Sequence, residues 1–239
     1  MKLNILHQDD HLVVVAKPAG LLSVPDRFDP ELPSLSHLLS RRIGTTALPV
    51  HRLDRPTSGL LVFAKTTDAQ RHLTKQFEER TVEKIYTAIV EGRPRDPRGS
   101  IDQALAPHPA KLGRMMVSAK GKSAQTKYQV IDFFGNTSLL EIELLTGRTH
   151  QIRVHLAYIG HPLLVDPFYG NHSEFKLSSL KGRRYNLKRG EVERPLLARV
   201  PLHAGRLSFT HPATEERLTF SAELPKDMRA TVAQLKKLG

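Results

Sequence analysis

The chain has 239 residues, a formal net charge of +12 at pH 7 and no cysteine. Its length suits one large domain or two smaller lobes that share a core. The positive charge favours binding to a polyanion, most often nucleic acid, although a role in solubility alone stays open. The lack of cysteine excludes disulfides, thiolate catalysis and cysteine-ligated zinc or iron–sulfur sites.

The chain begins with two short apolar runs at 3–7 and 11–16, which predict strands joined by a turn at 8–10. Asp9 and Asp10 interrupt the apolar stretch that a signal peptide would need. The longest apolar runs are far shorter than a membrane span. We therefore expect a soluble, cytoplasmic protein.

The next elements alternate between helix and strand after a loop rich in proline and glycine. A helix is predicted over 34–42, with the serine at its start as N-cap, and an apolar strand over 60–65. A second helix is predicted over 68–80, capped by Thr66 or Thr67. Apolar residues recur every four positions in this helix and are expected to face the core; they are Ala69, Leu73 and Phe77.

The middle of the chain predicts mostly strands. A strand at 82–92 precedes a loop rich in arginine and proline. Two further strands, at 123–134 and 137–145, are joined by the turn dipeptide Gly135-Asn136 and predict a hairpin. A helix over 149–160 ends at a glycine.

The segment 171–194 differs in composition, with seven lysines and arginines against three glutamates and few apolar residues. We interpret it as an inserted basic loop. Two short strands, at 205–210 and 216–221, and a helix from about Lys226 close the chain. Because hairpins outnumber strand–helix–strand units, the pattern predicts an α+β fold with a mixed, largely antiparallel central sheet flanked by helices.

Three familiar kinds of site are disfavoured by spacing. The run 121–123 resembles the end of a phosphate-binding loop but lacks the glycine five residues earlier. His150 and His155 fall on different faces of a helix and lack the spacing of a zinc pair, so no metal site is predicted. Asp54 has no acid nearby before Asp68, which disfavours a two-carboxylate sugar hydrolase.

Three segments remain, at 51–60, 84–90 and 146–170. Each has a structural interpretation when it is taken alone. An aspartate between arginines is usually a surface ion pair, Tyr86 can be a core residue, and the arginines and histidines of 148–155 can form a basic helix face.

Together these segments resemble the RluA family of RNA pseudouridine synthases. "HRLDRPTSGLLVFAKT" and "TGRTHQIRVHLAYIGHP" carry the resemblance, in the family's order, and it extends over nearly the whole chain. It implies a single catalytic domain over 1–239 with a central active-site cleft. It also implies isomerisation of selected uridines in structured RNA (tRNA, rRNA or both) without a cofactor or metal.

Many members of the family carry an N-terminal S4 RNA-binding domain, whereas we expect none in this chain, because its first residues already resemble the catalytic core. We therefore expect the insertion at 171–194 to add RNA binding, and we expect a monomer. The chain also departs from the family at Val165, which precedes Asp166 where a glycine is common.

The resemblance assigns the site residues one by one. Asp54 is the catalytic carboxylate; it acts as nucleophile on the ribose or on the uracil ring, or as base at C2′, and the sequence does not choose. Arg153 pairs with it and keeps it charged. Tyr86 stacks on the flipped uracil and Ile152 walls its pocket, while Arg52 fills the gap that the flipped base leaves.

Further residues are expected to bind RNA through positive charge or hydrogen bonds. Alongside Arg52 they are His51, Arg55, Arg148, His150, Lys181, Arg183, Arg184, Lys188 and Arg189. Two other functions remain alternatives. One is an RNA-binding or assembly factor without catalysis, and the other is a different basic enzyme, such as a sugar or nucleoside hydrolase.

Overall fold

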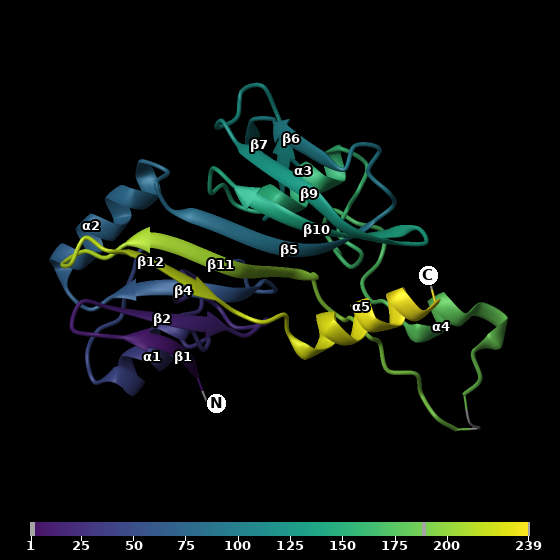
Figure 1. Cartoon of the computed structure of the whole chain (residues 1–239), viewed down its shortest axis with the longest axis horizontal. Coiled ribbons are helices and arrows are strands. Elements are labelled where there is room, and N and C mark those ends of the chain that lie inside the picture. The colour runs from purple at the N-terminus through teal and green to yellow at the C-terminus, as the bar shows by residue number, and fades with distance from the viewer. Residues whose placement is uncertain (1–2, 188–189, 239) are drawn as a thin grey trace. The chain divides into compact units, whose positions relative to one another are not determined.

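The computed structural model describes residues 3–187 and 190–238 and divides the chain into two compact units (Figure 1). Unit 1 comprises residues 1–86 and 203–223, and unit 2 comprises 87–202 and 224–239. The chain first passes between the units inside strand β5 (Glu83–Glu91). Each unit is therefore built from two separate stretches of sequence.

The sheet of unit 1 combines antiparallel and parallel pairing in the order β1-β2-β4-β11. The pairs β1–β2 and β2–β4 are antiparallel, whereas β4 and β11 are parallel. Two further strands pair with it, β3 with β4 and β12 with β11. The bounds are β1 Asn4–Gln8, β2 Leu12–Lys17, β3 Leu48–Pro49, β4 Ser58–Ala64, β11 Leu202–Thr210 and β12 Arg217–Ser221.

Strand β4 is buried along its whole length. Leu60 and Val62 pack with Leu73 of helix α2 (Thr67–Glu78), while the intervening Leu61 and Phe63 are fully buried on the other face. Since neighbouring side chains of a strand point to opposite faces, the sheet is covered on both sides at β4. This explains the continuous apolar run in the sequence.

Helices α1 (Leu35–Ile43) and α2 begin where their capping residues predict. The Ser34 side chain accepts a hydrogen bond from the backbone N–H of His37, and Thr66 accepts one from Ala69. These bonds satisfy N–H groups that a helix start leaves without a partner. The predicted caps are confirmed, and Thr66 rather than Thr67 caps the second helix.

Gly59 lets β4 and β11 approach closely. Its φ of +123° is a conformation that residues with a side chain rarely adopt. A Cβ placed there would lie 2.3 Å from the carbonyl oxygen of Ala204 in β11. Beside it, Ser58 Oγ and His203 Nδ1 form a hydrogen bond of 3.0 Å. These contacts join the start of β4, directly after the Asp54 turn, to β11.

Unit 2 contains an antiparallel sheet that includes the predicted hairpin. Strand β9 pairs with β10 on one side and with β6 on the other, while β7 and β8 form a separate small hairpin. The bounds are β6 Arg98–Asp102, β7 Leu105–Pro107, β8 Met115–Val117, β9 Gln125–Phe134, β10 Thr137–Leu144, α3 Gln151–Tyr158, α4 Leu177–Lys181 and α5 Lys226–Leu238. The predicted helix at 149–160 is confirmed as α3.

The interpretation of 171–194 as a loop is corrected in part. The segment contains the helix α4 and a 3₁₀ turn at Gly182–Arg184. Phe175 is buried in an apolar cluster with Leu197 and with Met228 of α5, and Leu180 packs against it. The few apolar residues of the segment therefore anchor it in the core of unit 2. The composition of the segment did not predict this, because its charged residues outnumber its apolar ones.

The predicted fold class is confirmed, because antiparallel pairs predominate among the strand pairs described above, β4 and β11 are parallel, and helices pack on the sheets. Within residues 3–187 and 190–238, no helix has the length and apolar character needed to cross a membrane. The single catalytic domain and its central cleft stay predictions.

Asp9 ties the β1–β2 turn to the β11–β12 hairpin within unit 1. Its Oδ2 is 2.6 Å from His7 Nε2 and 3.1 Å from His211 Nε2, and its Oδ1 accepts the N–H groups of His11 and Leu12. Burial favours the neutral acid, but these hydrogen bonds outweigh it and lower the pKa of Asp9 to about 2.

We expect Asp9→Asn to lower the free energy of unfolding by ~1–2 kcal/mol at neutral pH. Because the folded pKa lies below the unfolded value, this stabilisation is complete above about pH 4 and is lost as the pH falls towards 2. Urea unfolding of wild type and variant between pH 7 and pH 3 measures the difference. A difference in free energy of unfolding that stays constant from pH 7 to pH 3 would contradict the lowered pKa of Asp9.

Candidate active site

Asp54 lies in a turn of unit 1 that leads directly into β4. The backbone N–H of Thr57 donates to the carbonyl oxygen of Asp54 at 3.0 Å and closes the turn. Ser58, the next residue, is already the first residue of a strand buried on both faces. The half-buried carboxylate is thus carried by a rigid element, as a catalytic group requires.

A buried lysine, Lys17, holds the Asp54 turn in place through hydrogen bonds to backbone carbonyl groups. Lys17 is 1% exposed, and its Nζ donates to the carbonyl oxygens of Pro18 at 3.1 Å, Leu21 at 2.8 Å and Arg55 at 3.2 Å. Gly20 and Arg55 add two bonds: the Gly20 N–H donates to the Arg55 carbonyl, and Arg55 Nε donates to the Gly20 carbonyl. The ammonium therefore joins the loop after β2 to the turn.

Ser23 holds the other side of the turn. Its Oγ donates to the carbonyl oxygen of Leu53 at 2.8 Å and accepts the Leu53 N–H at 3.0 Å. Sequence reasoning missed both Ser23 and Lys17, since each lies in a stretch that reads as an exposed loop. Both residues lie in "KPAGLLSVP", which is part of the stretch that resembles the family, and this resemblance could have indicated a role for them.

His51 supports β4 rather than presenting a charge. Its Nε2 accepts the N–H of Val62 at 3.1 Å, and its ring stacks on Phe77 with centroids 4.4 Å apart. Burial, and then the positive charge of Lys84, lower the pKa of His51 to about 3. The side chain is therefore neutral at physiological pH, and its predicted contact with RNA, which stays a prediction, cannot rely on a positive ring.

Tyr86 belongs to the same neighbourhood as Asp54. The residue is 7% exposed, and its pKa is raised first by burial and then by the negative charge of Asp54. The hydroxyl therefore stays protonated and can donate a hydrogen bond. Arg52 and Arg55 are exposed at the same turn, as the predicted RNA contacts require.

Arg153 forms a buried ion pair with Asp166 in unit 2. Its Nε and Nη2 donate to the two carboxylate oxygens at 2.7 and 2.8 Å, and the side chains are 4% and 1% exposed. Asp166 Oδ1 also accepts the N–H groups of Phe168 and Tyr169. Sequence reasoning assigned Asp166 no role, although it stands in a matched segment; the predicted pairing of Arg153 with Asp54 stays a prediction.

Aromatic rings complete the surroundings of Arg153. Its guanidinium carbon lies 5.3 Å from the ring centre of Phe168 and 5.0 Å from that of Tyr169, within the range of cation–π attraction. The Tyr169 hydroxyl accepts the N–H of Met115 at 2.8 Å and bonds to His150 Nδ1 at 2.8 Å. His150 has a φ of +54°, so its backbone is held in a strained conformation just before α3.

A buried polar network fixes helix α3, which carries Arg153. Gln151 Nε2 donates to Thr126 Oγ1 at 2.9 Å, and Thr126 Oγ1 lies 2.9 Å from His155 Nδ1. His155 Nε2 lies 2.9 Å from the Gln103 carbonyl, while Gln151 Oε1 accepts the Thr146 hydroxyl. Every polar side chain in the chain of bonds has a partner, so the network stabilises one orientation of the helix.

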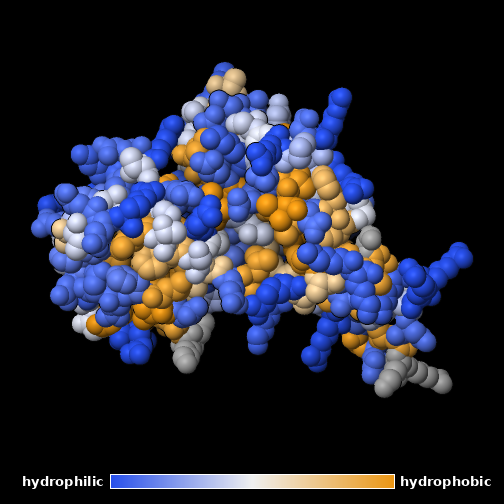
Figure 2. All heavy atoms as spheres, in the orientation of Figure 1, coloured by the Kyte–Doolittle hydropathy of each residue, from blue (hydrophilic) through white to orange (hydrophobic). Residues whose placement is uncertain are grey.

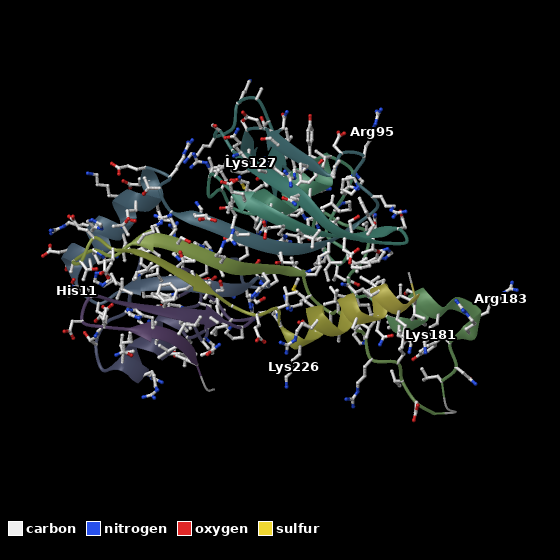
Figure 3. All side chains as sticks on the ribbon, in the orientation of Figure 1. His11, Arg95, Lys127, Lys181, Arg183 and Lys226 are labelled. Carbon is white, nitrogen blue, oxygen red and sulfur yellow. The ribbon has the colours of Figure 1, made fainter. Side chains whose placement is uncertain are left out.

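The remaining predicted residues lie on α3 and in its surroundings or on the basic segment. Ile152 is buried, and Arg148 is half-buried with its Nε donating to the carbonyl oxygen of Ser123. Arg183 and Arg184 are exposed, and Lys181 is half-exposed. Figure 3 shows Arg183 extending away from the ribbon beyond α4, and Figure 2 shows hydrophilic residues around this part of the surface. Lys188 and Arg189 lie outside the described residues.

Comparisons with known proteins place the chain among RNA-modifying enzymes. A relative from Nitrosomonas europaea, "Ribosomal large subunit pseudouridine synthase D", is 40% identical over 99% of this chain and 66% of its own length. A relative from Escherichia coli, "Dual-specificity RNA pseudouridine synthase RluA", is 39% identical over 92% of each chain. This chain thus spans about two thirds of the first relative and nearly all of the second.

Solved structures agree with the sequence relatives. The structure of human RNA pseudouridylate synthase domain containing 4 has a TM-score of 0.75 and 27% identity, over 98% of this chain and 93% of its own. The family model described as RNA pseudouridylate synthase matches residues 11–158, which include Asp54, Tyr86 and Arg153. The family predicted from the sequence is confirmed: the chain belongs to the RNA pseudouridylate synthases.

Proposed function

We propose that the protein converts selected uridines of RNA to pseudouridine. The reaction breaks the bond between ribose C1′ and uracil N1, turns the uracil, and joins C1′ to C5. All atoms are retained, so neither an oxidant nor a group donor is required, and we propose that no cofactor or metal takes part. We also propose that the protein acts as a monomer in the cytoplasm.

The observation that carries this proposal is the setting of Asp54. A turn held by Lys17 and Ser23 presents the carboxylate at the start of a buried strand, and its charge acts on the buried hydroxyl of Tyr86. A fixed carboxylate beside a protonated phenol suits a reaction that needs a nucleophile or base and a proton donor. The three routes for Asp54 remain open: attack on the ribose, attack on the uracil ring, and removal of the C2′ proton.

The other residues have supporting roles in the proposal. Base flipping brings the uracil to Tyr86 and Ile152, and Arg52 takes the vacated place in the stack. Arg153 pairs with Asp54 when RNA is bound and keeps the carboxylate charged. The bidentate bond to Asp166 and the rings beside the guanidinium support this role, because they hold Arg153 in one direction.

The substrate is proposed to be ribosomal RNA, tRNA or both. The printed names of the two relatives mention the large ribosomal subunit in one case and dual specificity for RNA in the other. The net charge of +12 fits either RNA. An RNA-binding or assembly factor without catalysis is the competing function.

A pseudouridine map of total RNA tests the proposal. Cells that lack the gene are complemented with wild type or with Asp54→Asn, and uridine sites are compared. We expect defined sites to vanish without the gene and to return only with wild type. Purified protein that binds these RNA segments but leaves every uridine unchanged would instead favour the competing function.

The basic segment is expected to strengthen RNA binding through interactions with phosphate groups. Replacing Lys181, Arg183, Arg184, Lys188 and Arg189 with glutamine should weaken binding and lower the slope of log Kd against log salt. The slope should fall by ~0.7–0.9 for each phosphate that the variant no longer neutralises. The measurement is fluorescence anisotropy on an RNA hairpin at several salt concentrations.

A control variant neutralises five exposed cations elsewhere in the chain: Arg41, Arg42, Lys75, Lys226 and Lys237. It has the same net charge as the test variant, so a weakening common to both reflects charge alone. Equal salt slopes for the two variants would remove the basic segment from the RNA-binding surface.

A further inference from the structure

A pocket of about 320 Å³ lies beside the Asp54 turn, wholly within unit 1. This volume is at the lower end of the range for sites that bind small organic groups, ~300–1,000 Å³. Its walls come from the loop after β2, from the residues before α1, and from the turn itself. The residues that matter here are Pro18, Leu21, Leu22, Leu32, Pro33 and Arg55.

The frame of the pocket is fixed by hydrogen bonds. Lys17 and Gly20 join the first wall to Arg55 through the bonds that also hold the turn. The Leu35 N–H donates to the carbonyl of Leu22 at 2.8 Å, which joins the first wall to the start of α1. A pocket held open in this way binds with little loss of conformational entropy.

The lining has the chemistry of a base site with one phosphate contact. The walls are apolar, and the only charge among the lining residues is that of Arg55, which is exposed. The adjoining loop carries three acids, Asp26, Asp29 and Glu31, against one arginine, Arg27, and this net negative charge disfavours a second phosphate. Apolar walls with one arginine suit a ligand that joins a flat, weakly polar ring to a single anionic group. In a basic protein of an RNA-modifying family, the ligand with this chemistry is one nucleotide of RNA.

We propose that the pocket binds the base of an unpaired nucleotide of the RNA substrate, adjacent to the target uridine, with Arg55 at its phosphate. The identity of the RNA as substrate rests on the proposed function. Because Arg55 directly follows Asp54, the bound nucleotide neighbours the one that reacts. Occupancy of this pocket then adds recognition of sequence or of loop shape, since a paired base cannot enter.

The direct test observes the pocket without using activity. The full chain is labelled with ¹³C at the leucine methyl groups and titrated with the trinucleotide UpUpU, and separately with inorganic phosphate. We expect the methyl resonances of Leu21, Leu22 and Leu32 to shift with the trinucleotide and to stay in place with phosphate, because a base ring changes their magnetic surroundings. Resonances that stay in place with UpUpU would overturn the proposal.

A second test fills the pocket. Ala19 lines it and is half-exposed, so Ala19→Trp should occupy the space of the base. We expect the KM for RNA to rise about tenfold, with a smaller fall in kcat, because the indole ring would exclude the base from the apolar walls. Ala230→Trp, on the exposed face of α5, is the matched control and should leave KM unchanged. Equal KM values for the two variants would count against the pocket.

The two tests separate this inference from the proposed function. Methyl shifts with UpUpU in a protein that makes no pseudouridine would support the pocket and reject the activity. Pseudouridine formation without methyl shifts, or with full tolerance of Ala19→Trp, would support the activity and reject the pocket.

Discussion

Asp54→Asn is expected to lower the rate of pseudouridine formation by at least about 10⁴-fold, as removal of a group that reacts covalently or as a base usually does. The amide keeps the size and shape of the side chain but lacks the negative charge. The turn should survive, because the bond that closes it uses the backbone carbonyl of Asp54 and not the side chain. RNA binding should persist or tighten, since the variant removes a charge that repels phosphate.

The measurement is single-turnover conversion of uridine in an RNA that contains a mapped site, with Kd determined on the same RNA. Asp68→Asn is the matched control, because Asp68 is 90% exposed on α2 and pairs with Arg71 at the surface. It should retain full activity. A rate for Asp54→Asn within about tenfold of wild type would remove Asp54 from the chemistry.

Asp166→Ala is expected to lower the free energy of unfolding by ~3–5 kcal/mol. The change leaves the buried guanidinium of Arg153 without this carboxylate and deprives the N–H groups of Phe168 and Tyr169 of their acceptor. The pair itself need not add much net stability, since both charges had to leave water. The destabilisation arises because the buried guanidinium loses its two hydrogen bonds to the Asp166 carboxylate.

Urea unfolding of three variants tests this explanation. Asp68→Ala removes an exposed pair and should cost ~0–1 kcal/mol. The double variant Arg153→Met with Asp166→Leu should be more stable than Asp166→Ala alone, since no charge remains buried. A cost below about 1 kcal/mol for Asp166→Ala would contradict the buried pair.

The parts of the fold that local chemistry determines were predictable. The Ser34 and Thr66 caps, the Gly135-Asn136 hairpin and the continuous burial of β4 follow from signals within a few residues. The short strands β3, β6, β7 and β8 gave no such signal. Each has two to five residues: β3 and β6 depend on pairing with the longer strands β4 and β9, and β7 and β8 form a hairpin of three residues a side, too short to show a periodic pattern.

The candidate site was predictable to a similar extent. Asp54, Tyr86 and Arg153 were named through resemblance, and the stretch that matches the family contains them. Lys17 and Asp166 were not found, because a lysine at the start of a predicted loop and an aspartate before a proline usually lie at the surface. Only the structure shows that the Lys17 ammonium donates to three carbonyl oxygens and that the Arg153 guanidinium binds the Asp166 carboxylate.

The interleaving of the two units along the sequence has a consequence for synthesis. Unit 1 lacks β11, the parallel neighbour of β4, until residues 203–210 have left the ribosome, and unit 2 lacks α5 until residues 226–238 emerge. Neither unit can finish folding before these late stretches are available. During much of its synthesis the nascent protein therefore contains the apolar strand β4 without its parallel neighbour. Rapid pairing of β11 with β4 then shortens the time for which this strand can aggregate.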